Sequence, residues 1–104
     1  MTFQRVTFAE WDIDVDTPEG HRLLDIVRSD GLALFRRQPG FIRYRLVRLG
    51  PSRTIALAEW DSEELALAGA ARYRSWLETA GLMAHITLTT ESGPVLISSD
   101  AEGT

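Results

Sequence analysis

Residues 36–65, RRQPGFIRYRLVRLGPSRTIALAEWDSEEL, decide how this chain folds. Within them, residues 41–49 and residues 53–60 are rich in apolar, β-branched and aromatic side chains, which predicts two β-strands. Gly-Pro-Ser at residues 50–52 is a short, turn-prone connection that favours antiparallel pairing of its two flanking strands. The stretch therefore predicts a β-hairpin.

Helix boundary signals flank this hairpin on both sides. Pro39 cannot continue a helix and Gly40 allows a sharp turn, so a preceding helix is expected to end there. Ser62 is a good helix N-cap, and two glutamates follow it where the helix dipole favours negative charge. A second helix is therefore predicted over residues 61–80, and Gly81 is expected to break or kink it.

The remaining segments complete the order of elements. Alternation at period two predicts a strand over residues 6–15, and Thr17 followed by Pro18 predicts the start of the first helix. Residues 82–89 leave a further helical turn and a strand both open. Residues 94–98, PVLIS, predict a last edge strand.

The order strand, helix, strand, strand, helix, strand is that of the ferredoxin-like α+β fold. In this fold a four-stranded antiparallel sheet carries both helices on one face, and its usual spatial strand order is 4-1-3-2. The chain of 104 residues is long enough for one core. We therefore predict a single domain over residues 1–98 and a flexible C-terminal tail over residues 99–104.

Alternation also assigns the strand residues to the two faces of the sheet. The face toward the helices is predicted to carry Trp11, Ile13, Ile42, Tyr44, Leu46, Ala56, Ala58 and Trp60. The open face is predicted to carry apolar Phe41, Val47, Ile55 and Leu57 beside charged Glu10, Asp12, Asp14, Arg43, Arg45 and Glu59. Such a mixed face suits self-association, so we predict a homodimer that pairs sheet to sheet.

The arginines of the opening stretch contrast with a net charge of −4 for the whole chain. A nucleic-acid site needs its arginines on one solvent face, whereas strand parity scatters these over two, so no nucleic-acid partner is expected. No apolar run is long enough to span a membrane and the first residues do not resemble a signal peptide, which predicts a cytoplasmic protein without a membrane partner.

The chain lacks cysteine, lysine and asparagine, and this removes several kinds of site chemistry. A thiol nucleophile, a thiolate metal site and a Schiff-base lysine are all impossible. No Asn side chain is present to hold an oxyanion. No metal and no cofactor are predicted.

Two motifs give the chain a resemblance to the antibiotic biosynthesis monooxygenase domain family. They are Pro39-Gly40-Phe41, after the first helix, and Trp60-Asp61-Ser62-Glu63-Glu64, where the hairpin meets the second helix. The resemblance covers roughly residues 3–98. It implies a ferredoxin-like subunit that pairs as a dimeric α+β barrel, with a ligand cleft between helices and sheet.

The resemblance also implies an activity, because enzymes of this family oxidise phenolic or quinol-like substrates with molecular oxygen and no metal or flavin. We therefore predict a cofactor-independent monooxygenase acting on an aromatic polyketide or a quinol. A non-catalytic dimeric module that binds a small aromatic ligand is the alternative. Several family members use an Asn in the site, which this chain lacks, and haem-cleaving relatives use a His that residues 66–71 do not contain. Haem cleavage is therefore not expected.

Trp60, Tyr73 and His85 are the predicted catalytic residues. Trp60 follows two small residues on its face, Ala56 and Ala58, which leaves room for a planar ligand. Tyr73 lies on the second helix, and His85 lies among apolar residues as the candidate proton acceptor. Ordinary core packing is the alternative for Trp60, and helix-to-sheet packing is the alternative for Tyr73.

Five residues are predicted to bind the substrate. Trp11 and Tyr44 would form aromatic walls on the sheet, and Ala58 would leave the space between them. Arg72 and Trp76 would approach from the second helix. Core packing is the preferred reading for Trp11, and packing against the sheet is an alternative for Trp76.

Overall fold

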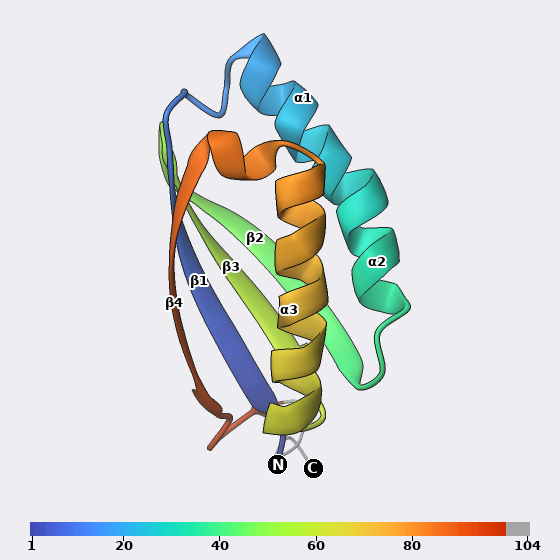
Figure 1. Cartoon of the computed structure of the whole chain (residues 1–104). Helices are drawn as coiled ribbons and strands as arrows, with labels where there is room; N and C mark the ends of the chain where they lie inside the picture. Colours follow the sequence, from blue (N-terminus) through green and yellow to red (C-terminus); the bar gives the residue numbers. More distant parts are fainter. Residues whose placement is uncertain (100–104) are drawn as a thin grey trace.

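A computed structural model of the chain describes residues 1–99, in which one antiparallel sheet carries the helices on one face (Figure 1). The spatial order of the four strands, β2-β3-β1-β4, confirms the predicted order and the ferredoxin-like fold. Apart from Ser99, the predicted tail lies outside the described residues. In chain order the elements are β1 Phe3–Trp11, α1 Pro18–Ile26, η1 Val27–Gly31, α2 Leu32–Arg36, β2 Phe41–Gly50, β3 Arg53–Trp60, α3 Glu63–Thr79, η2 Leu82–Ala84 and β4 Ile86–Pro94.

The local boundary signals act as predicted. Thr17 caps α1, since its hydroxyl accepts a hydrogen bond from the Gly20 N–H at 3.1 Å. Ser62 caps α3 in the same way, accepting from the Leu65 N–H at 3.3 Å. Gly81, at φ +82°, takes the left-handed conformation just after α3 and ends that helix.

The first helix contains a local irregularity that the sequence did not predict. Helices α1 and α2 continue through η1, a π-helical turn over Val27–Gly31 (Figure 1). Gly31 at the end of this turn packs closely on α3: a Cβ there would lie 3.2 Å from ring atoms of Trp76 and 3.2 Å from the Tyr73 hydroxyl. Because π-helical turns within helices often occur at functional sites, this contact directs attention to Tyr73.

The first strand ends earlier than predicted. Residues 6–15 were expected to form it, but β1 ends at Trp11, and Asp12 and Asp14 lie in the connection to α1. Asp14 Oδ1 accepts the Asp16 N–H at 2.8 Å, a local turn that replaces strand pairing. The predicted placement of Asp12 and Asp14 on the open sheet face is therefore wrong.

The connection after β1 still contributes to the core. Val15 is 2% exposed, and Ile13 packs against the same cluster of buried residues. The Val15 N–H donates to the Pro51 carbonyl at 2.8 Å, which holds this connection against the β2–β3 turn. The apolar alternation thus identified buried residues correctly but assigned them the wrong backbone conformation.

The last strand is also placed differently. Residues 94–98 were predicted as an edge strand, but β4 is Ile86–Pro94 and residues 95–98 have no regular structure. For residues 82–89 the sequence allowed either a helical turn or a strand, and the structure has both. The helical turn η2 occupies Leu82–Ala84, and β4 begins after one further residue. The edge strand therefore comes from a run of Thr-rich sequence with a weaker apolar signal.

A β-bulge moves Phe41 to the helix side of the sheet. Phe41 pairs with Trp60 and Arg43 pairs with Glu59, so Ile42 is an extra residue in β2. The Phe41 ring lies 5.5 Å from the Trp60 ring, within the core. Because a shift of one residue reverses the face that a strand residue points to, the predicted placement of Phe41 on the open face is wrong.

The open face nevertheless keeps an apolar centre. Cross-strand pairing places Leu57 between Val6 and Arg45, and the neighbouring row holds further apolar residues. Val47 is 43% exposed on this face, and its apolar neighbours are half-buried. The apolar side chains of this face, which we call the open-face patch, are Val6, Phe8, Val47, Ile55 and Leu57. None of the helices within residues 1–99 is both long and apolar enough to cross a lipid bilayer.

Candidate active-site cavity

A cavity of about 150 Å³ lies between the helix-facing side of the sheet and the helices. Such a volume holds roughly one benzene-sized ring. Its floor is made by two small residues on β3, Ala56 and Ala58, as predicted from their size. The lining residues are Arg5, Thr7, Trp11, Val27, Phe35, Tyr44, Leu46, Ala56, Ala58, Trp60, Ala70, Tyr73, Arg74, Leu77, Leu82, Ile86, Leu88 and Thr90.

Trp60 forms one wall of the cavity and is fully buried, at 0% exposure. Its six-membered ring lies directly against α3, where a Cβ on Gly69 would be 2.1 Å from the indole Cη2. The indole N–H is buried and has no hydrogen-bond acceptor among the described residues. A buried donor without an acceptor costs on the order of 1–3 kcal/mol.

Tyr44 on β2 and Tyr73 on α3 lie next to each other in the cavity lining. Their ring centroids lie 6.2 Å apart, and Phe35 packs against both rings. Burial raises the pKa of Tyr44 to about 12, and burial together with the charge of a Tyr44 phenolate raises the pKa of Tyr73 further. Both phenols are therefore neutral at physiological pH, and neither acts as a base.

A hydrogen bond links the two phenols; it acts to lower the pKa of Tyr44, against the larger effect of burial, and adds to the rise for Tyr73. A neutral phenol can both donate and accept a hydrogen bond. The Tyr44 hydroxyl is thus a polar group of the cavity lining that can pair with a ligand oxygen.

A second cavity of about 300 Å³ adjoins the first on the side of α1 and β2. The two share three wall residues: Val27, Tyr44 and Leu46. Val27 begins the π-helical turn η1, so the irregular part of the first helix lies at this shared wall. A ligand larger than one ring would have to displace the shared wall and occupy both spaces.

The structure brings five of the eight predicted site residues together around the first cavity. They are Trp11, Tyr44, Ala58, Trp60 and Tyr73. Trp11 is also fixed by its own hydrogen bond, since its indole N–H donates to the buried Thr54 hydroxyl at 3.0 Å.

Arg72 and Trp76 lie outside the lining of this cavity. The Arg72 guanidinium donates to the Gln38 side-chain oxygen at 2.8 Å on the exposed surface between α3 and the α2–β2 turn. Trp76 packs behind Tyr73, with ring centroids 5.2 Å apart, and against the Gly31 backbone. Both residues act through packing and surface contacts on the helices rather than as walls of the cavity.

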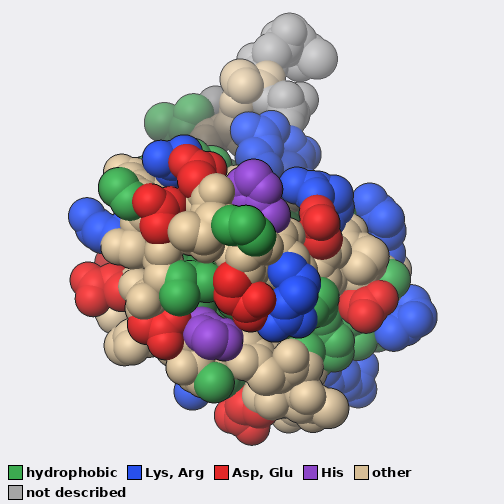
Figure 2. Space-filling view, turned by 90° about the horizontal axis from the view of Figure 1, so that it is seen from above, with side chains coloured by type: hydrophobic (Ala, Val, Ile, Leu, Met, Phe, Trp, Pro, Cys, Tyr) green, Lys and Arg blue, Asp and Glu red, His purple; other side chains and the backbone are tan. Residues whose placement is uncertain are grey.

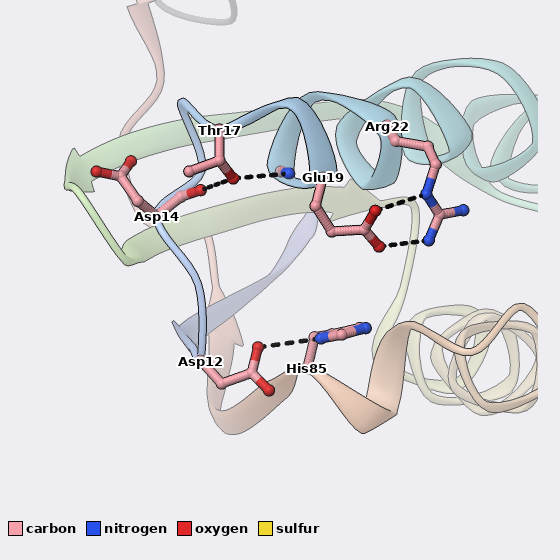
Figure 3. A network of polar contacts seen from close by, with 7 residues as sticks. Asp12, Asp14, Thr17, Glu19, Arg22 and His85 are labelled. Atoms are coloured by element: carbon pink, nitrogen blue, oxygen red, sulfur yellow. Dashed lines mark hydrogen bonds and ion pairs between the residues drawn. The ribbon is translucent and has the colours of Figure 1, made fainter.

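His85 lies at the end of η2, next to the cavity wall but outside its lining. Its Nδ1 is 3.0 Å from Asp12 Oδ1, and the ring is partly exposed beside α1 (Figure 3). Figure 2 views this end of the molecule and shows acidic, basic and His side chains interspersed around small apolar areas. The role of His85 as a proton acceptor stays a prediction.

The polar residues of the cavity were not predicted from the sequence. Arg5, Thr7 and Thr90 line it from β1 and β4, and the two threonine hydroxyls are 3.2 Å apart. Parity places Thr7 beside Trp11 on the helix-facing side, and would have placed Arg5 there had the predicted strand begun at Phe3. A charged residue on a face that otherwise carries apolar side chains was the available signal.

The lining supplies no set of metal ligands. Within residues 1–99, no three His, Cys, Asp or Glu side chains are close enough to hold a metal ion together. What the cavity offers is an aromatic enclosure, neutral hydroxyl donors and the guanidinium groups of Arg5 and Arg74. Such a site can bind and orient a planar, oxygen-bearing ligand.

No protein-family model and no curated protein matches the chain, but solved structures do. SnoaB of Streptomyces nogalater, a cofactor-independent oxygenase, is similar with a TM-score of 0.72 at 18% identity, over 93% of this chain and 95% of SnoaB. A Nitrosomonas europaea protein named a putative antibiotic biosynthesis monooxygenase is similar with a TM-score of 0.69 at 14% identity, over 91% of this chain and 90% of that one.

The chain has the fold of solved antibiotic biosynthesis monooxygenases. A dimeric ferredoxin-like protein from an uncultured marine organism is also similar, with a TM-score of 0.71 at 15% identity, over 93% of this chain and 97% of that one. The resemblance in the Pro-Gly-Phe and Trp-x-Ser-x-Glu motifs is thereby confirmed at the level of the fold. At these identities the likeness concerns the fold alone, and activity has to be argued from the cavity.

Proposed function

We propose that the protein is a cofactor-independent monooxygenase that oxidises a phenolic or quinol-type aromatic substrate with molecular oxygen. The observation that carries the proposal is the aromatic cavity itself: Trp60, Tyr44 and Phe35 surround a floor of alanines, with an unpaired indole N–H at the wall. A planar, electron-rich ring with oxygen substituents complements these walls and donors. The likeness to SnoaB supports the reaction class.

The proposed reaction needs few catalytic groups from the cavity. An electron-rich substrate that ionises to its oxyanion can pass electrons to oxygen directly. In the simplest outcome the phenol reacts through its keto tautomer: the ring CH₂ of that tautomer becomes C=O, one atom of O₂ enters the product, and the other leaves as water with the two hydrogens removed. The Tyr44 O–H and a nearby guanidinium would stabilise the oxyanion, and burial would keep solvent from the reactive intermediate.

A specific observation favours the second candidate, a non-catalytic module that binds a small aromatic ligand. Among residues 1–99, neither a carboxylate nor an imidazole lines the cavity, so this part of the wall offers no residue to take the substrate proton. The oxygenase proposal therefore requires a substrate acidic enough to ionise in water, or proton transfer to His85 beyond the wall. A binding module has neither requirement.

We propose that the protein works as a homodimer joined through the open-face patch. Helices cover only the other face of the sheet, while Val47 on the open face is 43% exposed. Leu96 and Ile97, in the segment after β4, are 75% and 79% exposed. A two-fold axis would let these apolar side chains cover each other, and the dimeric ferredoxin-like neighbour supports this arrangement.

Oxygen uptake with a panel of hydroquinones and anthrones tests the reaction. Ala58→Leu fills the cavity floor, and Ala68→Leu makes the same change on the exposed side of α3 as a matched control. We expect substrate-dependent uptake by the wild type and the control, and its loss in Ala58→Leu with retained circular dichroism. Ligand-induced quenching of Trp fluorescence without any oxygen uptake across the panel would instead establish the binding module.

A further inference from the structure

Arg5 is a charged residue on the side of the sheet that faces the helices. Its side chain is half-buried and lines the cavity beside Ala58. Burial lowers the pKa of its guanidinium from the ordinary value, yet an arginine remains charged at any physiological pH. Within residues 1–99 it takes part in no side-chain hydrogen bond and no ion pair.

Among residues 1–99, the charged side chains that line the cavity are both positive. The other one is Arg74, which already pairs with Glu78 on α3 at 3.5 Å. No Asp or Glu side chain of this described part of the chain lines the cavity. Half-burying a guanidinium without a carboxylate costs solvation free energy, and proteins normally offset that cost with a paired anion. Within residues 1–99 no carboxylate pairs with Arg5, so its guanidinium can pair with the anionic group of a ligand.

The sheet register places a second polar group opposite Arg5. Both Arg5 on β1 and Tyr44 on β2 pair with Ala58 on β3, so they stand on either side of this small residue in one row across the sheet. Two strand spacings separate them, roughly 10 Å at the backbone. An aromatic ring lying over Ala58 would therefore have Arg5 at one end and the Tyr44 hydroxyl at the other.

We propose that Arg5 binds the anionic group of a single-ring aromatic ligand whose opposite end carries an oxygen that accepts a hydrogen bond from Tyr44. The volume of about 150 Å³ fits one ring, and the Thr7 and Thr90 hydroxyls beside Arg5 provide further donors at the anionic end. This inference rests on the proposed function in taking the cavity as the substrate site. It narrows the substrate class to single-ring phenolics with oxygen groups at opposite ends.

Calorimetric titration with 4-hydroxybenzoate and 4-hydroxybenzamide tests the proposal, because the two probes match in shape and differ in charge. We expect wild-type protein to bind the benzoate at least tenfold more tightly than the benzamide. Arg5→Met keeps the apolar stem and removes the charge, and should bring the ratio close to one. Arg5→Lys should retain part of the preference, and Arg36→Met, at the exposed end of α2, should retain all of it.

Two results would overturn the inference: no detectable benzoate binding by the wild type, or the same benzoate preference in Arg5→Met. If Arg5→Met lacks the native circular dichroism, the comparison is made with Arg5→Gln. A failure of this inference can be distinguished from a failure of the oxygenase proposal. Anion preference without oxygen uptake keeps the role of Arg5 and rejects the reaction, whereas oxygen uptake without anion preference rejects the role of Arg5 alone.

Discussion

Gly69 permits the close contact between α3 and Trp60, and its replacement offers a sharp test of how the cavity wall is built. A Cβ at this position would lie 2.1 Å from Trp60 Cη2 and 2.5 Å from Cζ3. Carbon atoms normally approach to about 3.5–4.0 Å, so the overlap exceeds 1 Å. Trp60 is 0% exposed and has no room to move except into the cavity. We therefore predict that Gly69→Ala lowers the stability of the protein.

The magnitude follows from two opposing terms. Replacing Gly by Ala within a helix stabilises it by about 1 kcal/mol, because the unfolded chain loses conformational freedom. Overpacking a buried contact costs typically 1–3 kcal/mol, and the severe overlap at Trp60 places this site at the upper end. The free energy of unfolding of Gly69→Ala should therefore fall by about 2 kcal/mol.

The decisive measurement is a double-mutant cycle in urea at one protein concentration. Trp60→Phe removes the indole atoms that the new Cβ would meet. In that background only the helix term remains, so Gly69→Ala should raise the free energy of unfolding by up to about 1 kcal/mol. If Gly69→Ala lowers the free energy of unfolding in the wild type and raises it in Trp60→Phe, the cost comes from the contact with the Trp60 ring. Stabilisation by Gly69→Ala in the wild-type background would refute the reasoning about this wall.

Two further predictions concern the assembly and the tyrosines. Leu57→Asp or Arg43→Glu on the open face should shift the protein from dimer to monomer in sedimentation at micromolar concentration, and a wild-type species near 11.6 kDa would contradict the dimer. Because the folded-state pKa of Tyr44 is raised to about 12 from 10.0, the stability it confers is complete below pH 10 and is lost as the pH rises toward 12. Urea unfolding between pH 9 and about 12 should show this decline, and Tyr44→Phe should make it shallower, with the remainder due to Tyr73.

Local signals in the sequence located most element boundaries. β3 occupies the predicted residues 53–60, and Thr17 and Ser62 cap the helices that they were predicted to cap. These signals succeed because turn and cap preferences arise from the backbone and the nearest few residues. The strand over residues 94–98 was wrong because an apolar run in isolation does not show which segment pairs with β1.

The sequence likewise predicted some residues of the candidate site and missed others. Trp60 and Ala58 were identified from one strand, since alternation over a regular segment fixes which residues share a face. Arg5 was missed because the predicted start of the first strand excluded it, and Phe41 was misplaced because a bulge at Ile42 reversed its face. The alternation of apolar and polar residues alone predicts neither a β-bulge nor the residue at which a strand begins.

By itself, the sequence determined the order of elements, the ferredoxin-like strand order and the aromatic and small residues of the β2–β3 hairpin, because periodicity and capping are local properties. Only the tertiary structure decided that Arg5 and Tyr44 stand on either side of Ala58, residues that are distant in the chain. It also decided that no carboxylate of the described residues lies beside Arg5 in the cavity wall. The environment of a charge depends on every element packed around it, and no local pattern encodes that environment.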